Sequence, residues 1–234
     1  MRNKKIILIL LAVILVVIAS LLFIKLNSKE KENKSEAKDS IKFKEEYEKL
    51  NNSTSPKVSL EDDNPFVYTD IKKIVSTLKN GTGIIYLGFP KCPWCRNAVN
   101  VLQYINTDKI LYLDMTDVRD TYEVKDGALV KTKDAVKEYY EMLDILKDIL
   151  SDYEVVDNGV KYQTGEKRIY VPLVIGVLNG KIVGYHADTV DLEENQKPSD
   201  LLTEKQKSSL KLIYDEINSK VNSSSCDIDS EHGC

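Results

Sequence analysis

Residues 82–102 have the sequence Thr-Gly-Ile-Ile-Tyr-Leu-Gly-Phe-Pro-Lys-Cys-Pro-Trp-Cys-Arg-Asn-Ala-Val-Asn-Val-Leu, and they decide the expected fold. Residues 82–89 are an apolar run between a glycine and a proline, which is typical of a buried strand. Helical spacing follows, because apolar residues recur at Ala98, Val101, Leu102 and Ile105. Cys92 and Cys95 are therefore expected where a strand passes into an amphipathic helix.

This position gives Cys92 a predicted chemical role. Unpaired backbone N–H groups and the positive end of the helix dipole favour an anion at a helix start. Pro93 suits the first helical position because it has no N–H to leave unpaired, and Lys91 adds a positive charge. A thiol in this place tends to have a lowered pKa, and the thiolate is the form that attacks disulfides. We expect Cys92 to attack and Cys95, nearly one turn on, to resolve.

Two other interpretations of the paired cysteines are weaker. Half of a zinc site would normally be accompanied by a second Cys-x-x-Cys or a His-x-x-x-His downstream, and the sequence contains neither. A purely structural disulfide at one helix start would be strained and easily reduced. Redox use is therefore the favoured interpretation.

A second informative stretch lies downstream. Residues 169–178 are an apolar strand that contains Pro172, and residues 181–186 have the composition of a returning strand. Asn179-Gly180 separates them, and this dipeptide is a strong signal for a type I′ hairpin turn because both central residues need positive φ. Pro172 is awkward inside a strand unless it lies at an edge or turn.

At these points the chain resembles the thioredoxin-like superfamily, which places a cis-proline opposite the Cys-x-x-Cys, followed by an antiparallel hairpin and a final helix. The resemblance implies a cis bond at Val171–Pro172. We also expect the Val171 backbone to bind an extended substrate strand, as in β-augmentation. The final helix is expected from a capping box formed by Thr203 and Gln206.

The element order predicts an α/β protein with a thioredoxin-like fold, in which helices flank a central mixed sheet. Asp70 or Thr69 is expected to cap a first helix, and residues 110–114 to form the strand after the cysteine helix. Residues of about 115–168 exceed the basic plan, so they are expected to form an enlarged insertion before the cis-proline strand. The insertion should hold one or two small hairpins and a helix at about 132–150.

The residues between the cysteines refine the resemblance. Pro93-Trp94 is more similar to the Cys-Pro-aromatic-Cys of glutaredoxins than to the Gly-Pro of thioredoxins, and Trp94 is expected either to present an apolar platform to a substrate or to pack beside the disulfide. Residues 88–96 resemble the Gram-positive, membrane-anchored thioredoxin-like proteins often labelled bacteriocin transport accessory proteins. The departure is Tyr86, which stands where thioredoxins carry a buried acid. Asp114, at the end of the next strand, could substitute for that acid, but ordinary solvent exposure is the favoured interpretation of Asp114.

The N-terminus predicts a membrane anchor. Residues 6–24 contain no charge, glycine or proline, and they nearly span a hydrocarbon core of about 30 Å. A cleaved signal peptide is the alternative, but its apolar region is usually about 7–15 residues long. We expect residues 1–5 to form a cytoplasmic tail, residues 6–24 a single-pass signal anchor, and residues 25–57 a charged linker with a short amphipathic segment. The domain would then face outside the cell membrane.

The expected thioredoxin-like domain covers residues 58–222, and residues 223–234 form a tail with two further cysteines. Cys226 and Cys234 have three interpretations: a local disulfide, a second redox pair that exchanges with Cys92 and Cys95, or metal capture together with His232. His186 is expected to have a surface or packing role.

Composition limits the partners. The net charge is −4 and no basic cluster is interleaved with aromatic residues, so nucleic-acid binding has no support.

The expected activity is that of a membrane-tethered thiol–disulfide oxidoreductase that needs no cofactor beyond its own disulfide. Its partners would be protein or peptide thiols and disulfides, with a membrane redox partner as a further option. The alternatives are a non-catalytic adaptor for peptide export and a chaperone for Cu(I) or Zn, which thiolates suit.

Overall fold

A computed structural model describes residues 2–223, and for residues 2–16, 29 and 33 it describes the backbone only. The chain divides after Asp39 into two compact units. The first unit consists of residues of helix α1 (Arg2–Glu48), and the side chains of residues 17–28 are exposed. In the described part of the chain, no helix has the length and apolar content required to cross a membrane. Residues 6–16 of the predicted anchor have side chains outside the described set.

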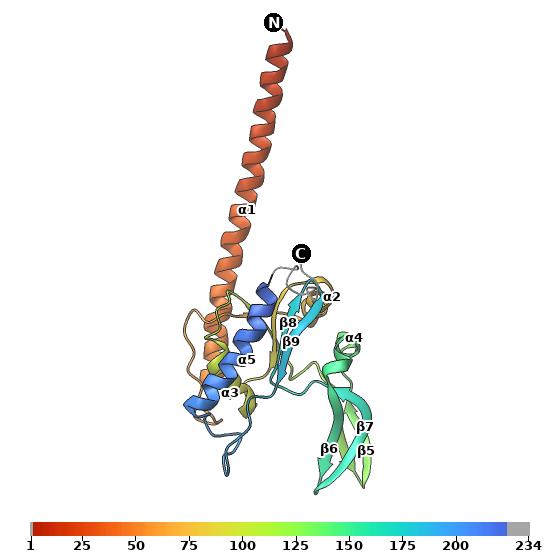
Figure 1. The fold of residues 1–234 in the computed structure, drawn as a ribbon. Helices are drawn as coiled ribbons and strands as arrows, with labels where there is room; N and C mark the ends of the chain where they lie inside the picture. The colour runs from red at the N-terminus through yellow and green to blue at the C-terminus, as the bar shows by residue number, and fades with distance from the viewer. Residues whose placement is uncertain (1, 224–234) are drawn as a thin grey trace, which may run out of the picture. The chain divides into compact units, whose positions relative to one another are not determined.

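A five-stranded mixed sheet is the centre of the second unit (Figure 1). Its strands lie in the order β1-β3-β2-β8-β9. Their bounds are Phe66–Tyr68 for β1, Ile110–Asp114 for β3, Gly83–Gly88 for β2, Leu173–Leu178 for β8 and Lys181–Ala187 for β9. β1, β3 and β2 run parallel, whereas β8 pairs antiparallel with both β2 and β9. The prediction of an α/β protein with a central mixed sheet is confirmed.

Helices cover both faces of this sheet, and the alternation along β2 shows why. Successive side chains of a strand point to opposite faces, so Ile84 and Tyr86 enter one core cluster while Ile85 and Leu87 enter the other. The first cluster also contains residues of the end of α1, of α3 (Pro93–Leu102) and of α5 (Glu204–Asn222). The second contains residues of α2 (Ile71–Asn80) and α4 (Lys137–Leu146).

The insertion contains two antiparallel hairpins with α4 and a short 3₁₀ helix, η1 (Lys147–Ile149), between them. The first pairs β4 (Thr121–Lys125) with β5 (Ala128–Lys133), and the second pairs β6 (Ser151–Asp157) with β7 (Val160–Arg168). The predicted helix at 132–150 begins later, at Lys137. The reason is that the Asp126-Gly127 turn starts a ladder in which Lys133 pairs with Thr121, so residues up to 133 are part of a strand.

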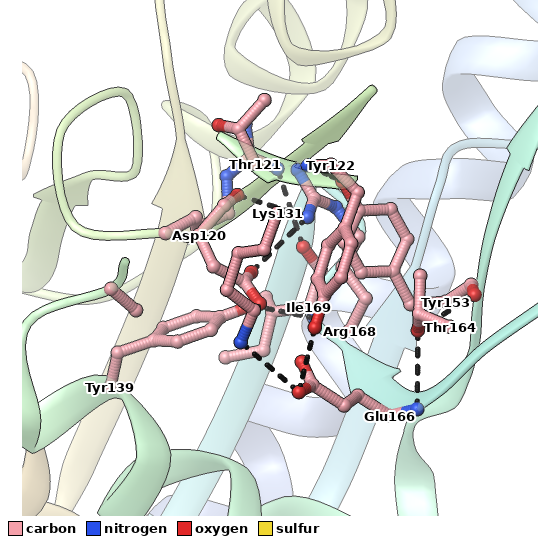
Figure 2. A network of polar contacts seen from close by, with 12 residues as sticks. Asp120, Thr121, Tyr122, Lys131, Tyr139, Tyr153, Thr164, Glu166, Arg168 and Ile169 are labelled. Atoms are coloured by element: carbon pink, nitrogen blue, oxygen red, sulfur yellow. Dashed lines mark hydrogen bonds and ion pairs between the residues drawn. The ribbon is translucent and has the colours of Figure 1, made fainter. Parts of the chain in front are cut away.

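A polar cluster joins the two hairpins (Figure 2). Lys131 Nζ lies 3.1 Å from Glu166 Oε1, and the Tyr122 hydroxyl donates to the same oxygen at 2.8 Å. Arg168 Nη1 lies 3.4 Å from Oδ1 of the buried Asp120. Burial, followed by the hydrogen bond to Glu166, raises the pKa of Asp120. Although burial acts in the opposite direction, the bonds from Tyr122 and Lys131 lower the pKa of Glu166. Within this cluster the fold therefore stabilises the charge of Glu166 and disfavours that of Asp120.

The predicted turns and caps are confirmed. Asn179 and Gly180 both have positive φ, 51° and 77°, as a type I′ turn requires. The Asp70 side chain caps α2 by accepting from Lys73 N, and Thr203 and Gln206 form the capping box of α5. The strand predicted at 169–178 begins only at Leu173, directly after Pro172.

The second unit begins at Ser40, earlier than the predicted domain start at residue 58. Phe43 and Tyr47, one helical turn apart, are completely buried. The Phe43 ring stacks on Phe66 at 4.1 Å between centroids and meets Tyr112 edge-on at 4.8 Å. The amphipathic segment inside the predicted linker is therefore a part of the core.

Candidate active site

Cys92 is the N-cap residue of α3. Its φ and ψ are −76° and 120°, and its sulfur accepts a hydrogen bond from Cys95 N at 3.3 Å. Pro93 occupies the first turn, as predicted. Cys92 is 7% exposed and Cys95 is completely buried. Both cysteines are thus buried, and the one that caps the helix is the less completely covered.

The sheet topology brings Pro172 to this sulfur. β8 runs antiparallel to β2 with Leu173 opposite Leu87, so the last residues of β2 lie beside the first residues of β8, at the same end of the sheet. Cys92 follows β2, and Val171 and Pro172 precede β8. The Val171–Pro172 bond is cis, as expected, and Cys92 Sγ lies 3.7 Å from the Val171 carbonyl oxygen. Val171 is half-buried and Pro172 is buried.

The two thiols differ in acidity. The pKa of Cys92 lies below its ordinary value, because its sulfur accepts hydrogen bonds from the Cys95 thiol and from the N–H groups of Cys95 and Trp94. Burial acts to raise this pKa but does not cancel the effect of the hydrogen bonds. Burial raises the pKa of Cys95 well above its ordinary value, and the neighbouring Cys92 sulfur adds to that rise. Cys92 is therefore the thiol of the pair that ionises first, and Cys95 keeps its proton to higher pH.

The other predicted site residues are less closely engaged. Lys91 is exposed and Trp94 is half-buried. His186 Nε2 lies 2.5 Å from the Thr189 carbonyl oxygen, and its ring meets Tyr214 edge-on, which fits the expected packing role. Asp114 Oδ1 accepts from Thr116 N, so this side chain stabilises a turn. Cys226, Cys234 and His232 lie outside the described residues.

Arg119 is a cationic neighbour that the sequence analysis missed. Its Nε donates to the Met115 carbonyl and its Nη1 to the Ile169 carbonyl, at 3.1 and 3.4 Å, and its guanidinium lies 5.3 Å from the centre of the Phe89 ring. Burial lowers the pKa of Arg119, whereas the charges of Cys95 and Cys92 act to raise it. No motif surrounds this residue, and it lies in the insertion, so the sequence offered no signal for it.

Arg96 is a second cation beside the pair, and it is completely buried. Its guanidinium donates to the carbonyl oxygens of Pro56, Tyr47 and Pro90 and to Asn51 Oδ1, at 2.5 to 3.1 Å. Burial lowers the pKa of Arg96. A single side chain thus fastens the loop before Cys92 to residues 47–56.

Tyr86 and Tyr47 are the third feature missed. Tyr86 lies on β2 beneath α3, and its hydroxyl oxygen is 3.1 Å from that of Tyr47. Both side chains are completely buried. Their signal was present only in part, because Tyr86 was recognised as a departure from the thioredoxin pattern while Tyr47 was assigned to a linker.

Comparisons of the chain with protein-family models, curated proteins and solved structures gave no match.

Proposed function

We propose that this chain is a thiol–disulfide oxidoreductase with a thioredoxin-like fold, acting on protein or peptide thiols and disulfides. One observation carries the proposal. The Cys92 sulfur caps α3, accepts from Cys95 N, and lies 3.7 Å from the carbonyl that precedes cis-Pro172. A thiol of lowered pKa held beside a more deeply covered thiol, next to the half-buried Val171, is suited to disulfide exchange.

The reaction has two steps. The Cys92 thiolate attacks a substrate disulfide R–S–S–R′, forming a Cys92–S–S–R bond and releasing R′–S⁻. The Cys95 thiol then loses its proton and attacks the Cys92 sulfur, so that Cys92–S–S–Cys95 forms and R–S⁻ leaves and takes up a proton. The substrate is reduced by two electrons and the pair is oxidised by two. The same steps in reverse oxidise a substrate dithiol.

The test is to trap the intermediate. A full-length chain with Cys226→Ser and Cys234→Ser should react with a disulfide-bonded peptide. Adding Cys95→Ser should leave a stable mixed disulfide on Cys92, because no resolving thiol remains. Adding Cys92→Ser instead should abolish the adduct. Adduct formation that is equal in the Cys92→Ser variant would contradict the proposal, and so would an unreactive Cys92 at neutral pH.

The membrane location stays a prediction from residues 6–24, as do the roles of Cys226 and Cys234. The adaptor alternative predicts a different genetic result: a Cys92→Ser strain would keep the phenotype of the parent while a deletion strain would lose it. A protease added to intact cells would degrade the domain if it faces outward.

A further inference from the structure

The insertion contains a half-buried arginine that contacts three segments around the Cys92 sulfur. Arg119 Nε donates to the Met115 carbonyl at 3.1 Å, and its Nη1 donates to the Ile169 carbonyl at 3.4 Å. Its guanidinium also lies 5.3 Å from the centre of the Phe89 ring. One side chain therefore joins parts of the chain that are distant in sequence, and the exchange steps described above give it no role.

Two of these partners adjoin the turn that carries the attacking sulfur. Phe89 directly follows β2, and its carbonyl oxygen accepts from Cys92 N at 3.2 Å. Met115 directly follows β3, and its N–H donates to the carbonyl of Gly88, the last residue of β2, at 3.0 Å. The guanidinium is thus anchored on the ends of the two parallel strands from which the chain turns to the cysteines.

The third partner belongs to the segment with the cis-proline. Ile169 is completely buried and lies two residues before Val171, whose carbonyl oxygen is 3.7 Å from Cys92 Sγ. The insertion bonds both backbone groups of Ile169, because its carbonyl accepts from Arg119 and its N–H donates to the Tyr139 hydroxyl at 3.4 Å (Figure 2). Ile169 lies between β7 and β8, so these two side chains, and not a strand ladder, hold its backbone.

The chemistry of arginine suits this place. The guanidinium is planar and its donors form a fixed fork, so it can hold two carbonyl oxygens and lie against an aromatic ring at the same time. Hydrogen bonds from a charged donor are also stronger than those between neutral groups. A lysine would keep the charge, but its single ammonium group on a flexible stem would lose the fixed geometry.

We propose that Arg119 is a positioning residue, which holds the cis-proline segment beside the Cys92 sulfur so that an extended peptide can pair with Val171. Arg119 makes and breaks no bond. It determines how strongly the protein prefers a disulfide within a peptide to a small disulfide, which has no backbone to pair. The inference rests on the proposed function and gives the insertion a role in substrate selection.

The experiment compares two uncharged disulfides that release the same small thiol. One is a short peptide whose single cysteine forms a mixed disulfide with 2-mercaptoethanol, and the other is bis(2-hydroxyethyl) disulfide. The parent is the full-length chain with Cys95→Ser, Cys226→Ser and Cys234→Ser. Its Cys92 thiolate forms a bond to one sulfur of the probe, the S–S bond of the probe breaks, and the released thiolate takes the electron pair and then a proton. Mass spectrometry of acid-quenched samples gives the rate constant of adduct formation for each probe.

The readout is the ratio of the rate constant for the peptide to that for the small disulfide. Both reactions use the same Cys92 thiolate, so a change in its ionisation or in the concentration of active protein cancels in the ratio. The parent should react faster with the peptide. Arg119→Met should lower the ratio by about 10-fold, the effect of removing hydrogen bonds from a charged donor. Arg119→Lys should lower it less, because the ammonium group can keep one of these bonds.

Two tyrosines of the insertion provide a matched pair of variants. Tyr139→Phe removes the hydroxyl that accepts from Ile169 N, so it should lower the ratio by a smaller factor than Arg119→Met, since this bond is between neutral groups. Tyr122→Phe removes a hydroxyl that donates to Glu166 within the polar cluster of the hairpins. The ratio for Tyr122→Phe should equal that of the parent.

The possible outcomes separate the two proposals. If neither probe forms an adduct, or if the adducts persist after Cys92→Ser, the proposed function fails. If the adducts depend on Cys92 but the parent does not prefer the peptide, or Arg119→Met keeps the ratio of the parent, only the Arg119 inference is overturned.

The tyrosine variants guard against general damage to the insertion. Equal losses in Tyr139→Phe and Tyr122→Phe would overturn the inference, because the effect would then not depend on the bond to Ile169. Should Arg119→Met not fold, an unchanged ratio in both Arg119→Lys and Tyr139→Phe overturns the inference equally.

Discussion

Gly180 lies at the point where the β8–β9 turn approaches the end of α2. Its φ is +77°, and a Cβ there would lie 2.1 Å from the Lys79 carbonyl oxygen. Gly127 has almost the same φ, +76°, but no heavy atom lies within 4 Å of its Cβ position. The two glycines therefore share a conformational requirement and differ in available space.

We expect Gly127→Ala to lower the free energy of unfolding by about 1–2 kcal/mol, which is the cost of a left-handed alanine. Gly180→Ala should cost about 2–4 kcal/mol, because overpacking against the α2 backbone adds to that strain. Urea unfolding of both variants measures the difference. Equal losses would show that α2 moves aside freely.

The end of α1 is an element whose importance only the folded chain reveals. Phe43 is completely buried, whereas Ile41, on the same helix, is 40% exposed. Phe43→Ala should lower the free energy of unfolding by about 3–5 kcal/mol, as for other buried phenylalanines. Ile41→Ala should change it by less than about 1 kcal/mol. A small effect at both positions, measured by chemical denaturation, would mean that this segment contributes little to the core.

The hairpin cluster offers a second prediction at the scale of elements. Glu166→Gln keeps the shape of the side chain but removes the charge that Lys131 and Tyr122 contact. Because the Glu166 side chain is 35% exposed, solvent screening limits the expected loss of stability to about 1 kcal/mol. Asp120→Asn should cost less than Glu166→Gln, since the fold raises the pKa of Asp120 and lowers that of Glu166, and so stabilises the charge of Asp120 less. Thermal unfolding of the two variants would test this order, and a larger loss for Asp120→Asn would contradict it.

At the scale of the whole molecule, the two cysteines couple stability to pH. In the reduced protein the folded pKa of Cys92 is lowered. Between this folded pKa and the unfolded pKa of about 8.5, only the unfolded state holds the Cys92 proton. The free energy of unfolding therefore rises with pH in this range. The folded pKa of Cys95 is raised, so above about pH 8.5 its proton is held only by the folded state, and stability falls. The free energy of unfolding of the reduced Cys226→Ser, Cys234→Ser chain, measured with urea, should show a maximum near pH 8.5.

The control for this prediction is Cys92→Ser in the same background, which should lack the rise below pH 8.5. The disulfide form has no thiol to titrate at this site and should show neither limb. A rise of the same size in the Cys92→Ser variant would assign the pH dependence to other groups.

The sequence predicted the features that depend on local chemistry. Cys92 at a helix start, the Asn179-Gly180 turn and the Thr203–Gln206 cap follow from residues close together in the chain. Arg119 and Tyr47 were missed because their partners are distant in sequence, the Ile169 carbonyl and the Tyr86 hydroxyl. The α4 start was wrong by several residues because strand pairing across Asp126-Gly127 outweighed helical periodicity.

The Cys92 sulfur also accepts the amide proton of Cys95 at the first turn of α3. A thiolate is a strong acceptor for that proton, and a sulfur bonded to another sulfur is uncharged and weaker. Each change in oxidation state would therefore tighten or loosen the beginning of the helix. Hydrogen–deuterium exchange at this one backbone position would then report the redox state of the protein without any reagent that reacts with sulfur.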